Sequence, residues 1–242
     1  MTKEEIASKT ISNIKLINDD YKNVDLNIPK SIIVIDPPFN IGYHYNSYKD
    51  NKDEETYYTE LANLIKYRPA VVIHYPESLH KLSIKLGYAP TKVVSWVYNS
   101  NTGKQHRDIA FYNIKPDFRK VPQPYKNPTD KRIKKLMAEG KGARLYDWWN
   151  INQVKNVSKK DITHPCVMPL EVMKNVIGVL PEDYTIIDCF MGTNTTGIAC
   201  GLLNREYIGI EVDPVYYQEA LDRTNEYLEE NMHDKENANG LD

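Results

Sequence analysis

The sequence predicts an α/β fold built on a doubly wound, mostly parallel sheet. Short apolar runs alternate with segments of helical pattern along most of the 242-residue chain, and three of these runs end on an acidic residue, Asp36, Asp188 or Glu211. Alternating strands and helices are typical of a parallel sheet with helices on both faces. Because such sheets bind ligands at the carboxyl ends of their strands, we expect the functional site where these acidic residues lie.

Length and composition indicate a single domain over residues 1–242. With 41% apolar residues, the chain can bury one sizeable core. The mean hydropathy is -0.58, and no apolar run approaches the ~18 residues that a membrane span needs. The segment Met1–Lys15 is polar and of mixed charge, unlike the apolar part of a signal peptide. We therefore expect a cytoplasmic protein without membrane contact.

The cysteines and histidines predict no metal site and no disulfide framework. Cys166, Cys189 and Cys200 are odd in number and show no Cys-x-x-Cys spacing, and the histidines show no close pairing with cysteines or acids. Buried, reduced thiols are the expectation.

The first half of the chain predicts strands and helices with clear end signals. Ser31–Asp36 is an apolar run closed by Pro37 and Pro38, which cannot donate to a strand ladder, and it predicts a buried parallel strand. Asp53 is a candidate helix N-cap, and Gly87 a candidate helix end. The other expected elements are helices over 54–67 and 77–86, a strand over 70–75, and an antiparallel strand pair over 93–98 and 109–114.

Regular structure returns at Pro169, a residue suited to a helix start. The expected elements are helices over 170–179 and 195–203, strands over 184–188 and 207–211, and a last helix from 214 to about 230. Residues 231–242 are polar and predict a flexible tail.

A local excess of positive charge lies between these halves. The net charge is -2, but residues 115–160 hold 13 Lys and Arg against 4 Asp and Glu. We expect residues 116–162 to form an insertion, with a short basic helix over 130–139, that lies on the sheet rather than in it. Such a cluster of positive charges is what contact with nucleic-acid phosphates requires. A basic loop that is simply solvated is the alternative, because it has the same composition. The candidate contacts are Lys131, Arg132, Lys134, Lys135, Lys141 and Arg144.

Residues 184–197 predict a strand, a tight turn with Gly192 and a hydroxyl-rich helix start. Glycine lets a ligand approach the backbone, and a helix start exposes N–H donors. Glu211 lies 19 residues after Gly192, a spacing that suits hydrogen bonds to ribose hydroxyls. No phosphate-binding lysine follows the turn, so a nucleoside cofactor without a phosphate chain fits better than a P-loop ligand. An ordinary strand–helix turn is the alternative.

The turn Asp36-Pro37-Pro38-Phe39 is the candidate reactive centre. The lone pair of an aromatic amine is delocalised into its ring, so the amine is a poor nucleophile. A carboxylate and a rigid backbone carbonyl that accept its hydrogens hold the nitrogen in a more reactive state, and prolines fix such a carbonyl. Phe39 offers a face on which a flipped base can stack. A simple strand-ending turn is the alternative here.

Four motifs in this order resemble the β-class amino methyltransferases of DNA, in which the catalytic motif precedes the cofactor motif. Residues 36–39 are similar to the family's Asp-Pro-Pro-aromatic motif, and 164–170 to its His-Pro element. Residues 188–196 are similar to its Asp-Pro-Phe-x-Gly-Ser-Gly-Thr-Thr cofactor loop, and 205–213 to its ribose-binding strand. The match runs from about Ile14 to Tyr227.

The resemblance implies a circularly permuted, Rossmann-like S-adenosylmethionine-dependent methyltransferase fold, with an antiparallel hairpin and a small basic insertion that reads DNA. Asp36, Pro37, Pro38 and Phe39 would be catalytic. Duplex DNA is the implied partner, with a homodimer and a separate restriction endonuclease left open. The implied cofactor-binding residues are His164, Pro165, Asp188, Phe190, Gly192, Thr193, Asn194, Thr195, Thr196, Glu211 and Asp213.

Two residues depart from the family pattern. Asn194 replaces the second glycine of the cofactor loop, and Met168 replaces the usual lysine of the His-Pro element. Asn tolerates the left-handed conformation better than other residues with a side chain, so the turn can survive. Neither change touches Asp36, so we expect an active enzyme.

The favoured hypothesis is methyl transfer to adenine N6, because the resemblance associates Asp at the first motif position with adenine. Cytosine N4 is the alternative within the same class. An RNA or protein methyltransferase is a second alternative, and a DNA-binding module that has lost transfer is a third. The nature of the methylated product discriminates among them.

Overall fold

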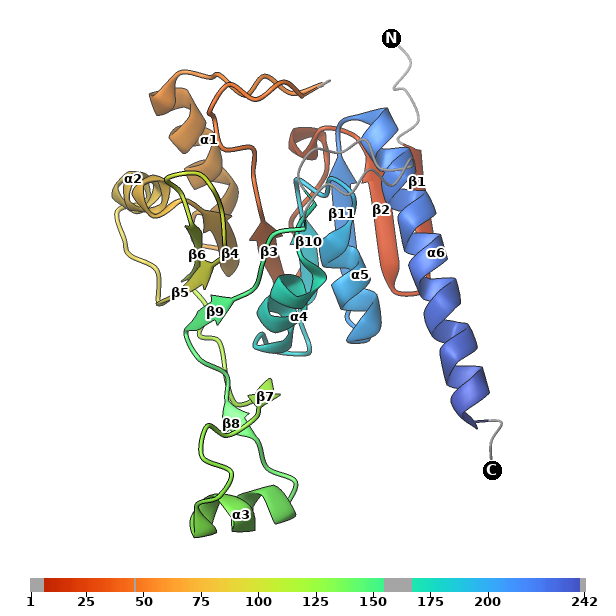
Figure 1. Cartoon of the computed structure of the whole chain (residues 1–242). Coiled ribbons are helices and arrows are strands. Elements are labelled where there is room, and N and C mark those ends of the chain that lie inside the picture. The colour runs from red at the N-terminus through yellow and green to blue at the C-terminus, as the bar shows by residue number, and fades with distance from the viewer. Residues whose placement is uncertain (1–6, 46, 155–166, 240–242) are drawn as a thin grey trace.

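The computed structural model describes residues 7–45, 47–154 and 167–239. A nine-stranded sheet crosses the molecule in the order β1-β2-β11-β10-β3-β4-β6-β5-β9 (Figure 1). The neighbours from β2 to β4 all pair in parallel, whereas β6 pairs antiparallel with both β4 and β5. This arrangement confirms the predicted α/β class, with its mostly parallel sheet and antiparallel hairpin.

The strands of this sheet are β1 (Ala7–Ile11), β2 (Ile14–Asn18), β3 (Ser31–Ile35), β4 (Ala70–His74), β5 (Lys92–Val97), β6 (His106–Tyr112), β9 (Trp148–Asn150), β10 (Thr185–Asp188) and β11 (Tyr207–Glu211). A separate small ladder pairs β7 (Pro122–Gln123) with β8 (Ala143–Arg144). The helices are α1 (Glu54–Ile65), α2 (Pro76–Leu86), α3 (Lys131–Ala138), α4 (Leu170–Gly178), α5 (Thr195–Leu202) and α6 (Pro214–Asn239), with a short 3-10 turn over Tyr21–Asn23.

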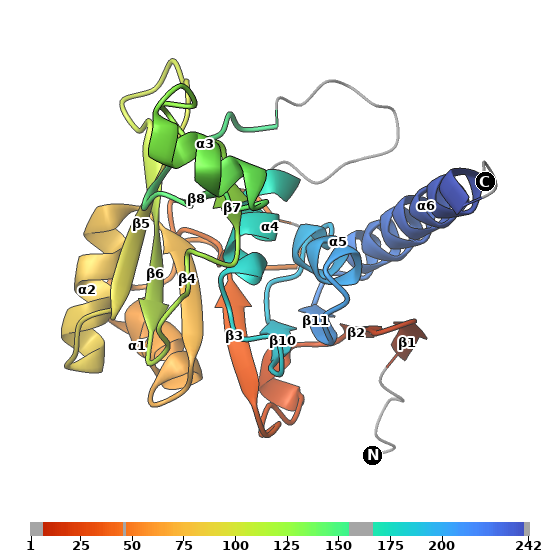
Figure 2. The same cartoon turned by 90° about the horizontal axis from the view of Figure 1, so that it is seen from below.

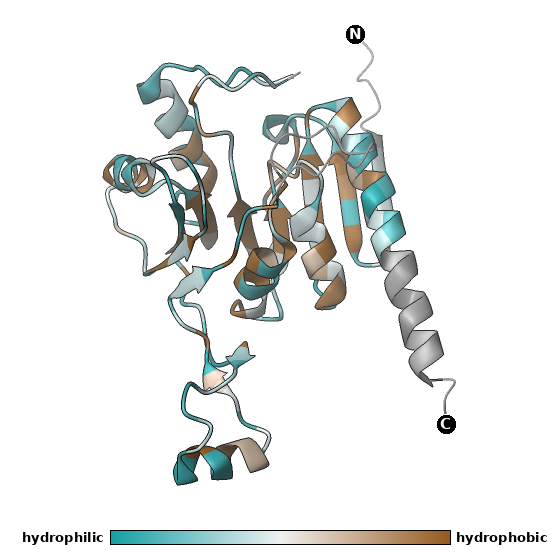
Figure 3. Cartoon of the chain, viewed as in Figure 1, coloured by the Kyte–Doolittle hydropathy of each residue, from teal (hydrophilic) through white to brown (hydrophobic). Residues whose placement is uncertain are grey.

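Helices cover both faces of the sheet because its central strands are apolar on both sides. In β3, Ile33 and Ile35 pack in one core with α1 and α2, whereas Ile32 and Val34 pack in a second core with α4, α5 and α6. Figure 2 shows the two helical layers on either side of the strands. In Figure 3 the central strands are mostly hydrophobic and the start of α3 is hydrophilic. None of the described helices combines the length and apolar character that a membrane crossing requires.

The predicted helix ends are confirmed by their caps. The Asp53 carboxylate accepts a hydrogen bond from Thr56 N at 2.9 Å at the start of α1. Gly87 ends α2 in the left-handed conformation with a φ of 80°.

The basic insertion departs from its prediction in two respects. Residues between β6 and β9 form an arm that carries the expected helix, α3, together with the short strands β7 and β8, which were not predicted. The strand β9, at the end of this segment, pairs with β5 and extends the main sheet. Trp149 is 4% exposed and packs in the core, and the burial of this side chain stabilises the pairing of β9 with the sheet. Its neighbour Trp148 is half-exposed and stacks on Tyr146.

Both ends of the chain also differ from expectation. The hairpin of β1 and β2 was not predicted, although Ile14, Leu16 and Ile17 are buried in it. The last helix was expected to end near residue 230, whereas α6 continues to Asn239. Residues 231–239 contain neither Gly nor Pro, so nothing in them breaks a helix; Gly240 follows directly.

Candidate active site

The carboxyl ends of β3, β10 and β11 meet at one edge of the sheet, the upper edge in Figure 1, and border a pocket. Parallel strands bring their ends together, so the two predicted motifs come into one site although some 150 residues separate them. The predicted residues that line the pocket are Asp36, Pro37, Pro38, Phe39, Asp188, Phe190, Gly192, Thr193, Thr195, Thr196, Glu211 and Asp213.

Asp36 directly follows β3, and its carboxylate has one buried and one accessible side. Oδ1 is buried and has no hydrogen-bond partner among the described residues, while the side chain as a whole keeps 29% of its surface exposed. Arg107 Nη1, from β6, lies 3.7 Å from Oδ2. Burial raises the pKa of Asp36 to about 6, and the charge of Arg107 opposes that rise. A buried acceptor without a donor suits an incoming N–H group.

Phe39 is already in contact with three side chains. Its ring centroid lies 4.5 Å from that of His74 and 5.0 Å from that of Tyr75. The guanidinium carbon of Arg107 lies 4.6 Å from the same centroid. Phe39 therefore belongs to an aromatic and cationic stack, and only the part of its ring that faces the pocket is available to a base.

Asp188 ends β10 and holds the turn that follows. Its Oδ1 accepts from Phe190 N at 3.0 Å, and its Oδ2 accepts from Thr196 Oγ1 at 2.7 Å. Burial raises the pKa of Asp188 to about 7; these hydrogen bonds oppose the rise, whereas the charges of Asp36 and Glu211 add to it. Gly192 adopts a φ of 52° in this turn, which glycine tolerates without strain.

Glu211 ends β11 and closes the same turn from the other side. Its two carboxylate oxygens accept from Gly192 N and Asp213 N, both at 2.9 Å. Burial raises the pKa of Glu211 despite these bonds. Asp188 and Glu211, which are buried, and the partly buried Asp36 thus line one pocket, and the charges of Asp36 and Glu211 add to the rise in the pKa of Asp188. A ligand with positive charge would favour the ionised form of these carboxyl groups.

Asn194 supports this turn without lining the pocket. It adopts the left-handed conformation that we predicted, with a φ of 63°, and is fully buried. Its Oδ1 accepts from Gly197 N at 3.2 Å, and its Nδ2 donates to Thr224 Oγ1 on α6 at 2.7 Å. The side chain therefore fastens α5 to α6, and direct contact with a cofactor, which we expected, does not follow from this position.

A tyrosine-rich loop after Phe39 forms another wall of the pocket, through Tyr43, Tyr45 and Tyr48. Asp50, which the sequence analysis missed, organises it: the buried carboxylate accepts from the backbone N–H groups of Asn40, Ile41 and Tyr43 at 2.7–3.2 Å. No local pattern marks Asp50, because its partners are seven to ten residues away.

The Asp213 carboxylate joins this loop to the end of β11. Ser47 Oγ donates to Asp213 Oδ2 at 2.8 Å, while Asp213 Oδ1 accepts from Val215 N at 2.8 Å and caps α6. The expected cofactor ligand Asp213 thus lines the pocket, but its oxygens serve a helix cap and a loop contact.

A comparison with models of protein families identifies the family of this chain. A family model described as DNA methylase (N6_N4_Mtase) matches residues 71–222, well over half of the chain. The chain belongs to this DNA methylase family. The match confirms the resemblance seen in the sequence. It begins after the Asp-Pro-Pro-Phe turn, so the interpretation of that turn depends on the geometry described above.

Two named relatives align with most of this DNA methylase. Type II methyltransferase M.HpaI of Haemophilus parainfluenzae is 25% identical over 92% of this chain and 74% of its own length. Type II methyltransferase M.BglII of Bacillus subtilis is 24% identical over 84% of this chain and 66% of its own length. The methylase thus spans about two thirds to three quarters of these relatives.

Solved structures share its fold. The PvuII DNA methyltransferase (cytosine-N4-specific) superposes with a TM-score of 0.65 at 16% identity, over 91% of this chain and 92% of the other. The complex of M1.HpyAVI with S-adenosylmethionine superposes with a TM-score of 0.57 at 19% identity, over 88% and 99%. At these identities the likeness concerns the fold.

The cofactor of this DNA methylase is S-adenosylmethionine, and its pocket fits that molecule. The methyl-bearing sulfur is positively charged, which matches the carboxyl groups of Asp36, Asp188 and Glu211 that line the pocket. Asp188, Glu211 and the turn around Gly192 are the residues that would hold the nucleoside part. Among the described residues, no group of three His, Cys, Asp or Glu side chains could hold a metal ion.

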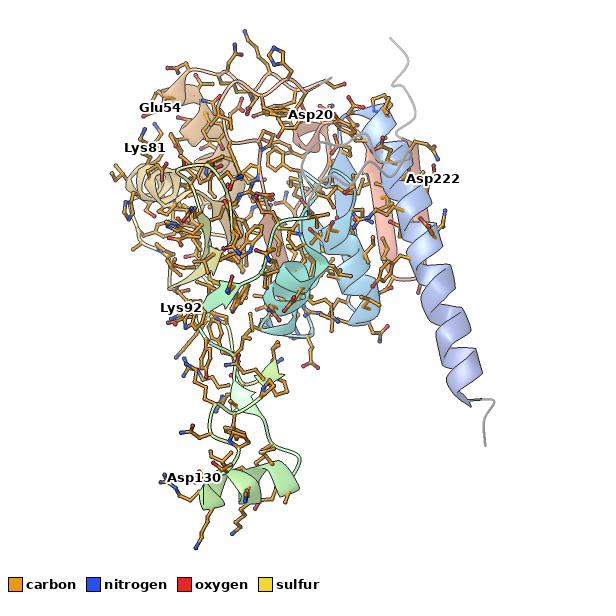
Figure 4. All side chains as sticks on the ribbon, viewed as in Figure 1. Asp20, Glu54, Lys81, Lys92, Asp130 and Asp222 are labelled. Carbon is orange, nitrogen blue, oxygen red and sulfur yellow. The ribbon has the colours of Figure 1, made fainter. Side chains whose placement is uncertain are left out.

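The predicted DNA contacts of the methylase lie far from this pocket. The strand β6 runs antiparallel to β4 and ends at the opposite edge of the sheet, so the arm hangs from that edge. In Figure 4, Asp130 at the start of α3 and Asp20 beside the pocket edge are at opposite ends of the molecule. All six predicted cations are exposed there: Lys131, Arg132, Lys134, Lys135, Lys141 and Arg144.

The remaining predictions concern the His-Pro element and the cysteines. His164 and Pro165, expected near the cofactor, lie outside the described residues, as does Cys166. Cys189 and Cys200 are free and buried, as predicted. Met168, which departs from the family pattern, lines the pocket where the family carries lysine.

Proposed function

We propose that this methylase transfers a methyl group from S-adenosylmethionine to N6 of an adenine in duplex DNA. The observation that carries the proposal is the position of Asp36. Its partly buried carboxylate lines the same pocket as Asp188 and Glu211, so a base amino group there would meet both the acceptor and the methyl donor.

The turn supplies two acceptors for the two hydrogens of an amino group. The Asp36 carboxylate is one. The carbonyl of Pro37, a residue that also lines the pocket, is the other in this proposal, while the Pro38 carbonyl accepts from Tyr57 Oη at 2.7 Å. Both hydrogen bonds would draw the amine away from conjugation with its ring and expose the nitrogen lone pair.

Bound S-adenosylmethionine supplies an activated methyl group. As the nitrogen–carbon bond forms and the carbon–sulfur bond breaks, the amine nitrogen becomes positively charged and must lose a proton. Asp36 is the acceptor at hand, and its pKa of about 6 lets it take this proton and return it to water near neutral pH.

Cytosine N4 is the second candidate, favoured by the fold likeness to the cytosine-N4-specific PvuII enzyme. Both targets are aromatic amines and use the same two acceptors. The aspartate in the first motif position, where the resemblance associates serine with cytosine, supports adenine.

The arm supplies phosphate contacts in this proposal. Its exposed cations would neutralise DNA phosphates without reading bases. The arm projects from the edge opposite the pocket, so this contact would lie well away from the flipped base. The Type II names of the relatives support a restriction–modification setting with a separate endonuclease as partner. A cytoplasmic location and a homodimer belong to the same proposal, and sedimentation with and without DNA would test the dimer.

The decisive experiment incubates the protein with isotope-labelled S-adenosylmethionine and unmethylated genomic DNA, and analyses the digested nucleosides by mass spectrometry. Labelled N6-methyladenine is the expected product. Labelled N4-methylcytosine would change the target and keep the enzyme class. Label in RNA or protein alone, or cofactor and DNA binding without transfer, would overturn the proposal.

Asp36→Ala is the matched control. It should lower turnover on the order of 100-fold or more while cofactor binding persists, because it removes an acceptor needed only as the amine reacts. Near-normal turnover of Asp36→Ala would contradict the assignment of Asp36.

A further inference from the structure

Two buried polar side chains lie directly behind the Asp-Pro-Pro-Phe turn. Tyr57 comes from α1 and is 2% exposed; His74 ends β4 and is 1% exposed. Tyr57 Oη lies 2.7 Å from the Pro38 carbonyl oxygen and 2.8 Å from His74 Nε2. Neither side chain lines the pocket, so neither is placed to touch a substrate.

The direction of each hydrogen bond in this group follows from counting donors. Tyr75 N–H can only donate, and it lies 2.8 Å from His74 Nδ1, so Nδ1 accepts and carries no proton. Burial and nearby positive charges lower the pKa of His74 to about 3, so the ring is neutral and its one proton is on Nε2. His74 Nε2–H therefore donates to Tyr57 Oη, which leaves the Tyr57 hydroxyl proton for the Pro38 carbonyl.

The hydrogen bonds from His74 to Tyr57 and from Tyr57 to Pro38 supply a donor that the turn itself lacks. Pro37 and Pro38 have no backbone N–H, so the turn cannot be fixed by main-chain donors at these positions. The Tyr57 hydroxyl holds the Pro38 carbonyl instead, and the His74 ring packs against Phe39 with centroids 4.5 Å apart. One pair of side chains thus fixes both the backbone and the aromatic ring of the turn.

We propose that Tyr57 and His74 are positioning residues for methyl transfer, which act through Pro38 and Phe39 to hold Asp36 and the Pro37 carbonyl against the amino group. The proposal rests on the proposed function above. Small displacements of reacting groups reduce rates steeply, so the loss of one buried hydroxyl should appear in turnover.

The test compares Tyr57→Phe with Tyr112→Phe. Tyr112 is also buried, and its hydroxyl lies 3.0 Å from Ser83 Oγ, away from the pocket. Both variants keep the ring and lose one hydroxyl, so similar losses of Tm are expected. Only Tyr57→Phe should lower kcat, on the order of 10-fold or more, with the Kd for S-adenosylmethionine unchanged.

A double variant tests whether the two side chains act as a unit. His74→Phe keeps a ring beside Phe39 and removes the Nε2 donor, so its effect on kcat should not add to that of Tyr57→Phe. Equal kcat in Tyr57→Phe and Tyr112→Phe, or full additivity in the double variant, would overturn the proposal.

A readout without turnover separates this proposal from the proposed function. Nitrogen-15 spectra of histidine-labelled protein should show His74 neutral and protonated on Nε2 from pH 5 to 8, and Tyr57→Phe should speed exchange of that proton. A proton on Nδ1, or no effect of Tyr57→Phe on exchange, would refute the hydrogen-bond chain even if no substrate were methylated. Absence of product from the unaltered protein alone would count against the proposed function.

Discussion

Arg107 Nη1 lies 3.7 Å from Asp36 Oδ2, and this contact couples the β5–β6 hairpin to the reactive turn after β3. Both side chains are largely enclosed, so water screens their attraction weakly. Arg107 also lies over the Phe39 ring, which holds the guanidinium in place. The charge of Arg107 therefore limits the rise in the pKa of Asp36 that burial causes.

The first prediction concerns the pH dependence of catalysis. Burial raises the pKa of Asp36 to about 6. The protonated carboxyl group can no longer accept both an amine hydrogen and a proton, so kcat should fall as the pH drops through 6. Replacement of Arg107 by Met removes the charge that opposes the rise, so the acidic limb of the pH–rate profile should move to higher pH.

Arg107→Lys is the control for this shift, because it keeps a positive charge and alters the packing on Phe39. Its acidic limb should stay close to that of the unaltered protein. If Arg107→Met folds with a similar Tm and its acidic limb does not move, the coupling between Arg107 and Asp36 is refuted.

The second prediction concerns cofactor affinity. The pKa of Asp188 is raised to about 7, so this carboxyl group is largely protonated at pH 6 and ionised at pH 8. Ionised Asp188 attracts a positively charged ligand, hence affinity for S-adenosylmethionine should increase as the pH rises through 7. Titration calorimetry at pH 6, 7 and 8 would measure this.

Asp188→Asn should weaken binding at pH 8 and flatten the pH dependence, because the amide cannot ionise. A pH dependence equally steep in Asp188→Asn would assign it to another group, with Glu211, whose pKa burial also raises, as the next residue to replace.

Much of the fold and site could be predicted because its signals are local. The apolar run 31–36 with its two prolines, and the turn around Gly192 followed by Glu211, each combine strand, turn and chemistry within a short segment. Parallel pairing of β10 with β3 and β11 then brings these segments together without further information.

The residues that were missed act at long range in the sequence. Arg107, Tyr57 and His74 contact the turn from β6, α1 and β4, far from it in the sequence, so no local pattern marks them. The location of the arm was missed for a related reason. It depends on the direction of β6, and a strand's direction follows from its pairing partner rather than from its own residues.

The third prediction concerns Asn194, whose side chain is fully buried and bonded to Gly197 N and Thr224 Oγ1. Asn194→Ala should lose about 1–3 kcal/mol of unfolding free energy from these hydrogen bonds, plus about 1 kcal/mol for the left-handed backbone. Asn194→Gly, the residue of the family pattern, should lose less because it tolerates the positive φ. Denaturant unfolding would measure both.

The folded molecules of either Asn194 variant should bind S-adenosylmethionine with nearly unchanged affinity, since the Asn194 side chain does not line the pocket. A large loss of affinity in Asn194→Gly would show instead that the amide contacts the cofactor. Normal turnover of the unaltered protein would exclude the idea that Asn194 marks an inactive relative.

The last prediction separates the arm from the pocket. Reversing Lys131, Lys134 and Lys135 to Glu should weaken DNA binding and lower the slope of log K against log salt by about 3, since each contacted phosphate contributes roughly 0.9. The Kd for S-adenosylmethionine should not change, because α3 lies at the opposite edge of the sheet. The control reverses three exposed lysines on the body, Lys15, Lys66 and Lys174, which matches the change in net charge. A salt slope that falls equally in both triple variants would mean that net charge, and not the arm, governs the DNA contact.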